Sequence, residues 1–178
     1  MDTQAFEFRK ATIKDTDAIF KLYKQVSKTK GGLARSDDEI SKKYVEQFIL
    51  KSLAKGVAFI IADKLHENKI IGEIHCYKQD PKVFTHVFSD LTIAIHPDYQ
   101  GKGLGKKLFE TLLNYITASR RDILRVELIA AESNSRAIKM YEKLGFIIEG
   151  KFERRIATPD NKLQADIPMA WFNPKYSR

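Results

Sequence analysis

The pattern of apolar and polar residues along this chain changes its period several times, and these changes predict the order of its elements. Apolar side chains three or four positions apart indicate helices, whereas alternation or a short apolar run indicates strands. The segments with strand-like patterns are 6–11, 57–64, 69–78, 88–95, 124–130, 147–157 and 163–172. The last two read as a closing hairpin, because Thr158-Pro159-Asp160-Asn161 between them has the chemistry of a turn.

Two helices are predicted between the first strand and the second. Residues 14–17 supply acids and a cap for the first, and Gly31-Gly32 breaks it. For the second, Ser36 and Glu39 have the spacing of a capping box, which predicts a helix beginning at Ser36. The apolar positions that define the two helices are Ile19, Phe20, Tyr23 and Val26, then Ile40, Tyr44, Val45, Phe48 and Ile49.

Two more helices follow the strand at 88–95. One carries Leu104, Leu108, Leu112, Leu113 and Ile116 on a single face. The other covers 133–146 and ends at Gly145 as a C-terminal cap. This element order predicts a mixed α/β sheet, neither doubly wound nor a helix bundle of the nucleic-acid-binding kind. Since the chain shows no repeat and no linker, we expect residues 1–178 to form one domain.

Charge and composition narrow the function classes. The chain of 178 residues has a net charge of +8, but its lysines are scattered among acids, which favours solvated helix faces and a small anion over nucleic acid. Cys76 is the only cysteine, so an internal disulfide and a cysteine-based zinc site are excluded. The four histidines lack metal spacing, and we expect no metal.

The apolar run at 57–62 is too short to span a bilayer, so no membrane association is expected. The first ten residues have no apolar run, which argues against a signal peptide. Both features favour a cytoplasmic protein.

The stretch HPDYQGKGLGKKLFETLLNYI, residues 96–116, carries the clearest chemical signal. Gly101, Gly103 and Gly105 allow close approach of a ligand or a positive φ. The helix that follows has free amides in its first turn and the positive end of its dipole, which together bind anions. Lys106 and Lys107 oppose that dipole, so an anion there would relieve them. An ordinary glycine-rich turn with outward lysines is the alternative.

Two phosphate-binding motifs do not fit the loop. A Walker A loop requires Gly-Lys-Ser/Thr after its spacers, and this segment lacks it. A dinucleotide fingerprint requires G-x-G-x-x-G at the start of a parallel unit, which glycines at 101, 103 and 105 do not give.

The loop does match Q/R-x-x-G-x-G/A, from Gln100 to Gly105. Together with LTIAIHPDYQGKGLGKKLFETLL and, one strand later, NSRAIKMYEKLGF, it resembles the GNAT superfamily of N-acetyltransferases over essentially the whole chain. The resemblance implies a mixed, mostly antiparallel central sheet of about seven strands flanked by helices, with a splayed fourth strand. It implies transfer of an acetyl group from acetyl-CoA to a primary amine by direct attack in a ternary complex.

The resemblance also implies the cofactor-binding residues. Amides of the loop hold the pyrophosphate, and they belong to Gln100, Gly101, Lys102, Gly103, Leu104, Gly105 and Lys106. The freed backbone of Ile93, Ala94 and Ile95 pairs with the pantetheine amides in the manner of an added strand. Asn134 matches the asparagine that binds the pantetheine arm, although a helix cap would explain it equally well.

Tyr141 matches the general acid of the family, which assists departure of the coenzyme A thiolate; packing of its ring inside a helix is the alternative. The amine must lose a proton, and strand parity singles out two carboxylates. Asp90 is placed opposite Leu91, Ile93 and Ile95, and Glu73 on the face of His75 and Tyr77. Either carboxylate, or a chain of waters, can be the base, and either can instead be a satisfied polar residue.

The family places the acceptor site beside the two early helices. There Arg35 is a candidate for binding an acidic group of the substrate, whereas the capping box already accounts for Glu39. The backbone N–H of Ile95 is the implied oxyanion donor. The acceptor can be a small molecule or a peptide amine, and a second copy of the chain is the protein partner considered.

Two other functions compete with catalysis. A non-catalytic domain that binds or senses acyl-CoA would keep the loop without turnover. A basic nucleic-acid binder is supported by net charge alone.

Overall fold

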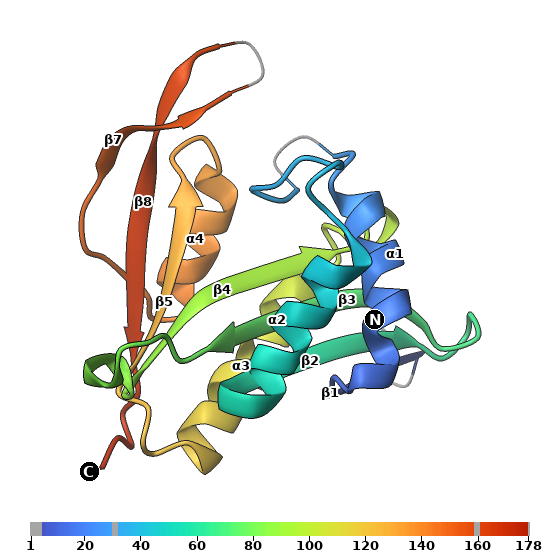
Figure 1. Ribbon diagram of the computed structural model, residues 1–178, viewed down its shortest axis with the longest axis horizontal. Coiled ribbons are helices and arrows are strands. Elements are labelled where there is room, and N and C mark those ends of the chain that lie inside the picture. The colour runs from blue at the N-terminus through green and yellow to red at the C-terminus, as the bar shows by residue number, and fades with distance from the viewer. Residues whose placement is uncertain (1–4, 30–31, 159–160, 178) are drawn as a thin grey trace. The chain divides into compact units, whose positions relative to one another are not determined.

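The computed structural model describes residues 5–29, 32–158 and 161–177, which hold four α-helices and eight strands (Figure 1). The chain forms two compact units. The first comprises Met1–Tyr77 and Thr92–Tyr115, and the second Lys78–Leu91 and Ile116–Arg178. This mixed α/β fold is the predicted class. That the whole chain is one domain stays a prediction.

In the first unit, β1 (Phe6–Lys10), β2 (Gly56–Asp63) and β3 (Lys69–Tyr77) form an antiparallel sheet. The end of β4 (Val87–Ile95) continues it, and the His96 amide donates to the Ile71 carbonyl at 2.8 Å.

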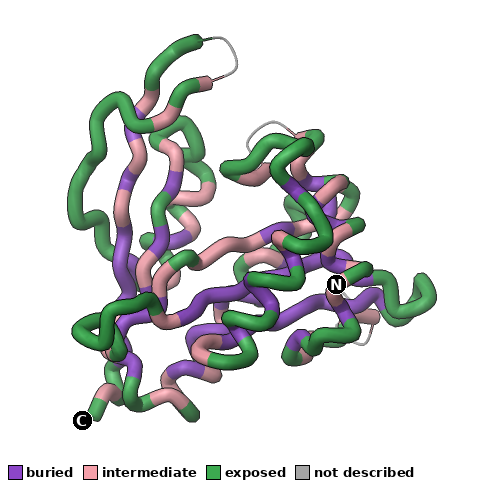
Figure 2. The backbone as a smooth tube through the Cα atoms, in the orientation of Figure 1, coloured by how far each residue is buried: buried purple, intermediate pink, exposed green. Residues whose placement is uncertain are grey.

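Helices cover both faces of this sheet, so β2 and β3 are buried along almost their whole length (Figure 2). Ala58 and Ile60 pack into a cluster with the apolar faces of α1 (Thr16–Val26) and α2 (Lys42–Lys55). On the other face, Phe59 contacts Tyr115 of α3 (Leu104–Ser119) with ring centroids 5.6 Å apart. Burial on both faces explains why these strands read as apolar runs in the sequence.

In the second unit, the start of β4 runs parallel to β5 (Arg125–Ala131). The long strand β8 (Leu163–Phe172) is antiparallel to β5 and also pairs with β6 (Ile147–Ile148) and β7 (Phe152–Ala157). Helix α4 (Ser135–Lys143) connects β5 to β6 and ends before Gly145, whose φ of 92° confirms the predicted left-handed cap.

The predicted start of the second helix was wrong. Ser36 and Glu39 do contact each other as half of a capping box, with the Ser36 amide and hydroxyl both donating to the Glu39 carboxylate at 2.9 Å. However, they close an isolated turn, and α2 begins at Lys42 with Ser41 accepting a hydrogen bond from the Tyr44 amide at 3.1 Å. Ile40 lies before the helix and is buried in the core, so this position is fixed by packing and not by helix formation.

The strand predicted at 147–157 is in fact two strands, which makes eight described strands rather than about seven. Ile147 pairs with Ala170, and Phe152 pairs with Asp166, so the two segments contact different parts of β8. Gly31 and the turn residues Pro159 and Asp160 lie outside the described residues.

Among the described residues, none of the helices combines the length and apolarity needed to cross a membrane. The same residues contain no group of three or more His, Cys, Asp or Glu side chains arranged to hold a metal ion.

The helix start gives a test of stability. Ser41→Ala should lower the free energy of unfolding by about 1 kcal/mol, because it removes the cap of α2. Ser36→Ala should cost less, since its turn is exposed and starts no helix. Urea denaturation of both variants measures the difference, and a larger loss for Ser36→Ala would contradict the assignment.

Candidate cofactor-binding site

The glycine loop connects β4 to α3 through a single 3₁₀ turn, Pro97–Tyr99. Gly101 and Gly103 adopt φ values of 75° and 76°, a left-handed conformation that side chains with a Cβ disfavour. Gly105 is under no such constraint, because a Cβ there would lie 3.6 Å from Cγ1 of Ile95, an ordinary van der Waals contact. Gly101 and Gly103 are therefore the glycines that shape the turn.

The main-chain amides of this loop lie at the start of α3. The Gln100 amide donates to the Pro97 carbonyl, and the first bond of the helix runs from the Lys107 amide to the Gly103 carbonyl at 3.1 Å. Between them, the amides of residues 101–106 have no acceptor within the described parts of the chain. Six consecutive donors at the positive end of a helix are suited to binding an anion, which makes this row a candidate site.

The lysines of the loop also have protein partners, and their predicted interaction with an anion stays a prediction. Lys106 forms an ion pair with Glu110 at 3.1 Å, exposed enough to contribute little. The ammonium of Lys107 lies 5.0 Å from the centre of the Phe8 ring, and that of Lys102 lies 5.0 Å from the Tyr99 ring. The amides and the helix dipole are therefore the main candidates for binding an anion.

The residues at the end of β4, just before the loop, differ in how far they are buried. Ala94 is buried, whereas Ile93 and Ile95 are half-buried. The Ile95 carbonyl accepts a hydrogen bond from the Gln100 side chain at 3.0 Å. Gln100 thus holds the loop to the end of the strand.

Glu73 is fully buried and held by two donors: Tyr23, which the sequence did not identify, and His75, which strand parity placed on the same face. The Tyr23 hydroxyl donates to its carboxylate at 2.6 Å, and His75 Nδ1 lies 3.1 and 3.2 Å from its two oxygens. The Phe48 ring stacks on His75 with centroids 4.0 Å apart. Burial, followed by the charge of Glu73, raises the pKa of Tyr23 well above 10.0, so its hydroxyl stays a donor.

Asp90 is exposed and has a φ of 53°. A left-handed residue interrupts the alternation of a strand, so counting along β4 cannot assign its face relative to Ile93 and Ile95. The parity argument fails at this position for that reason. Asp90 belongs to the second unit, and Glu73 to the first.

Asn134 and Tyr141 lie on α4 in the second unit. Asn134 is the N-cap, with its carbonyl oxygen accepting from the Ala137 amide at 3.3 Å. Tyr141 is 8% exposed, and its ring centroid lies 6.0 Å from that of Phe146. Burial raises the pKa of Tyr141 to about 12, so the phenol is protonated at neutral pH.

Arg35 is exposed in the first unit, with its guanidinium carbon 4.4 Å from the centre of the Tyr44 ring. The Tyr44 ring in turn packs against Phe48, 5.3 Å away. The aromatic contact orients Arg35 without neutralising its charge.

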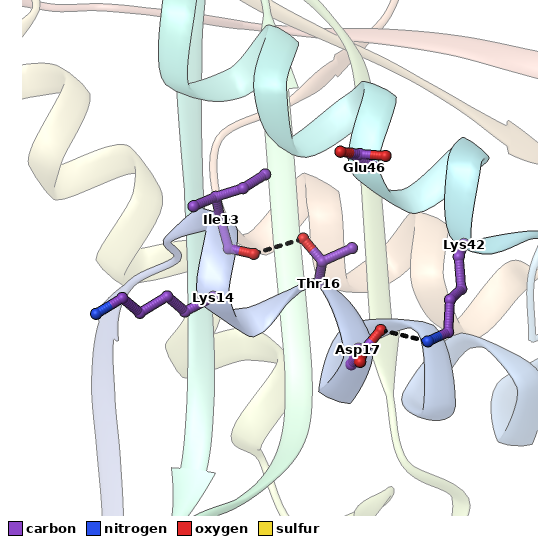
Figure 3. A pocket seen from close by; sticks show the side chains of 6 residues that line it. All are labelled: Ile13, Lys14, Thr16, Asp17, Lys42 and Glu46. Atoms are coloured by element: carbon purple, nitrogen blue, oxygen red, sulfur yellow. Dashed lines mark hydrogen bonds and ion pairs between the residues drawn. The ribbon is translucent and has the colours of Figure 1, made fainter.

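A hollow of about 310 Å³ lies between the starts of α1 and α2 (Figure 3). It is lined by Ile13, Lys14, Thr16, Asp17, Lys42 and Glu46, with Lys42 and Asp17 paired at 2.8 Å. A second hollow, of about 550 Å³, involves Lys82, His86 and Asp122. Neither hollow contains a residue predicted to bind the cofactor. The unpaired amides of residues 101–106 therefore indicate the candidate cofactor site better than cavity volume does.

Curated relatives match part of this chain. The spermidine N(1)-acetyltransferase of Escherichia coli K12 is 35% identical over 66 residues, which cover 37% of this chain and 35% of the relative. The [ribosomal protein bS18]-alanine N-acetyltransferase of the same organism is 43% identical over 54 residues, covering 30% and 35%. Each match thus spans about a third of the relative's length.

Solved structures match almost the whole fold. A GNAT-family acetyltransferase from Streptococcus pneumoniae superposes with a TM-score of 0.83 at 24% identity, covering 94% of this chain and 99% of that one. The yncA protein of Salmonella typhimurium, solved with its cofactor acetyl-CoA, has a TM-score of 0.82 at 16% identity and covers 97% and 96%. The model of the acetyltransferase (GNAT) family matches residues 21–146, well over half of the sequence, and the chain belongs to this family.

Proposed function

We propose that this protein is an N-acetyltransferase that moves the acetyl group of acetyl-CoA to a primary amine by direct attack in a ternary complex. The observation that carries the proposal is the row of amides at 101–106 without an acceptor in the described chain. A diphosphate can accept several of these hydrogen bonds at once, next to the helix dipole. The acetyl-CoA bound to the yncA protein supports this choice of anion.

In this proposal the loop amides of residues 101–106 hold the pyrophosphate, and Gln100 is excluded because its amide already donates to the Pro97 carbonyl. The backbone of Ile93, Ala94 and Ile95 pairs with the pantetheine arm, and the Asn134 amide group assists. Asn134 can do both jobs, because its carbonyl oxygen caps α4 while its NH₂ group has two donors of its own. The Ile95 N–H is the proposed donor to the developing oxyanion.

The chemistry forms a C–N bond and breaks the C–S bond of the thioester. Tyr141 is the proposed acid at the sulfur. Since its pKa is about 12 and that of a free thiol about 8.5, complete transfer of its proton would cost roughly 5 kcal/mol. Tyr141 therefore acts mainly by donating a hydrogen bond to the departing thiolate, which takes its final proton from the medium.

The amine must lose a proton during attack, and we assign Asp90 as the base, directly or through a water. Asp90 is exposed, whereas Glu73 has no exposed surface and already accepts from Tyr23 and His75. Glu73 then influences catalysis only through those partners.

The proposed acceptor is a small-molecule or peptide amine, a class that includes the acceptors in the names of the spermidine and ribosomal-protein relatives. Arg35 would select acceptors that carry an acidic group. Thiol release from acetyl-CoA across a panel of polyamines, amino acids and peptides tests this. Coenzyme A binding without thiol release from any amine would favour the sensing function instead.

The loop assignment predicts a specific effect of charge. Gly103→Asp should abolish the rise in melting temperature that acetyl-CoA produces, because a carboxylate would meet the pyrophosphate. Gly103→Asn is the matched control, since Asn has the same shape, tolerates a positive φ and carries no charge. Thermal unfolding with and without acetyl-CoA measures both, and full protection of Gly103→Asp would rule out the loop.

Tyr141→Phe should lower kcat about 100-fold while leaving the Kd of acetyl-CoA unchanged, because the ring remains and only the donor is lost. Tyr176→Phe, in the same unit, is the control. With a pKa of about 12, Tyr141 should not cause a fall in rate below pH 10. Wild-type turnover in Tyr141→Phe would remove this residue from the mechanism.

The two carboxylates should respond differently. Asp90→Asn should lower kcat/KM for the amine by about 100-fold with little loss of stability, as expected for an exposed base. Glu73→Gln should lower the melting temperature more and the rate less, because it disturbs a buried network. Steady-state kinetics and thermal unfolding separate these effects, and the reverse pattern would make Glu73 the base.

A further inference from the structure

A buried carboxylate at the end of β2 holds the residue that precedes the glycine loop. The Tyr99 hydroxyl donates to Asp63 Oδ2 at 2.7 Å, and Asp63 is 2% exposed. His66 Nδ1 lies 2.8 Å from the same oxygen, and the Leu65 amide donates to the other oxygen at 2.9 Å. Asp63 therefore ties the β2–β3 turn to the start of the loop.

Charge keeps this contact strong. The hydrogen bond to Asp63 is the main reason that the pKa of Tyr99 is raised to about 12, so the phenol remains a donor. Burial alone would raise the pKa of Asp63, but the bonds from Tyr99, His66 and the Leu65 amide together lower it. A neutral donor on an ionised, buried acceptor is a charge-assisted bond.

Further contacts fix the Tyr99 ring from several directions. Phe6 and His96 meet it edge-on, with centroids 6.3 and 5.6 Å away. The ammonium of Lys69 donates to His96 Nε2 at 3.2 Å, and that of Lys102, inside the loop, lies over the Tyr99 ring. All of these residues belong to the first unit.

We propose that Asp63 is a positioning residue: by accepting the hydrogen bond of Tyr99 it fixes the glycine loop, and so sets the affinity for the cofactor rather than the rate of acetyl transfer.

The physical reason is conformational entropy. A loop with two left-handed glycines has many accessible backbone conformations, and a diphosphate must order them to align the amides. Tyr99 directly precedes Gln100, so its anchor removes part of this freedom before the ligand arrives. Without the anchor the amides remain present but are aligned less often, which lowers affinity.

The inference rests on the proposed function, because it assumes that the loop binds coenzyme A. Calorimetric titration of the wild-type protein with coenzyme A tests that assumption by itself. If the wild type does not bind coenzyme A, the proposed function fails, and the positioning role fails with it. If the wild type binds, the variants test the positioning role alone.

Tyr99→Phe keeps the ring and removes only the hydroxyl. We expect about tenfold weaker binding of coenzyme A, the loss typical of one hydrogen bond to a charged group. The KM for acetyl-CoA should rise by a similar factor, while kcat stays within about twofold. Asp63→Asn should have a similar effect. Combining it with Tyr99→Phe should weaken binding little further, because both substitutions disrupt the same hydrogen bond between Tyr99 and Asp63.

Tyr115→Phe is the matched control, since Tyr115 also carries a cation over its ring, Lys10 at 4.0 Å, but lies outside the loop. It should bind coenzyme A like the wild type. A Tyr99→Phe variant with a lower melting temperature but wild-type affinity for coenzyme A would overturn the proposal, because the contact would then serve stability alone. The proposal is equally overturned if kcat falls and KM does not, or if neither variant folds.

Discussion

The proposed site depends on a row of unpaired hydrogen-bond donors: the amides of residues 101–106 have no acceptor in the described chain. Every helix has unpaired amides at its start, but two left-handed glycines here extend the row back into the loop. These donors belong to the main chain, so the side chains matter here mainly where the left-handed φ values of Gly101 and Gly103 disfavour a Cβ. The three lysines of the loop engage Glu110, Phe8 and the Tyr99 ring, so they add positive charge around the row without forming it.

The surroundings of the row are built to keep it in place. Gln100 ties the loop to the Ile95 carbonyl at the end of β4, and Tyr99 ties it to Asp63 at the end of β2. Together these two contacts restrict a glycine-rich segment whose backbone has many accessible conformations. The buried Tyr23–Glu73–His75 network is held in the same way, since a carboxyl group without solvent access has partners on two elements.

The fold could be predicted largely because its signals are local. Apolar runs at β2 and β3, the face of α3 and the cap at Gly145 all appear in the sequence within a few residues of each element. Predictions failed where a local pattern had more than one solution: Ser36 and Glu39 contact each other in an isolated turn that starts no helix, and Asp90 breaks strand alternation with a positive φ. The partners of Glu73 and of Tyr99 could not be foreseen, because Tyr23 and Asp63 are distant in sequence and only the folded sheet brings them near.

The most direct test of the central claim is an amide-resolved NMR titration with coenzyme A on the ¹⁵N-labelled protein. The amides of residues 101–106 should show the largest chemical-shift changes in the first unit. They should also gain protection from solvent exchange, because the bound coenzyme A supplies the acceptor that they lack. Saturable binding that leaves these six amides unchanged would contradict it.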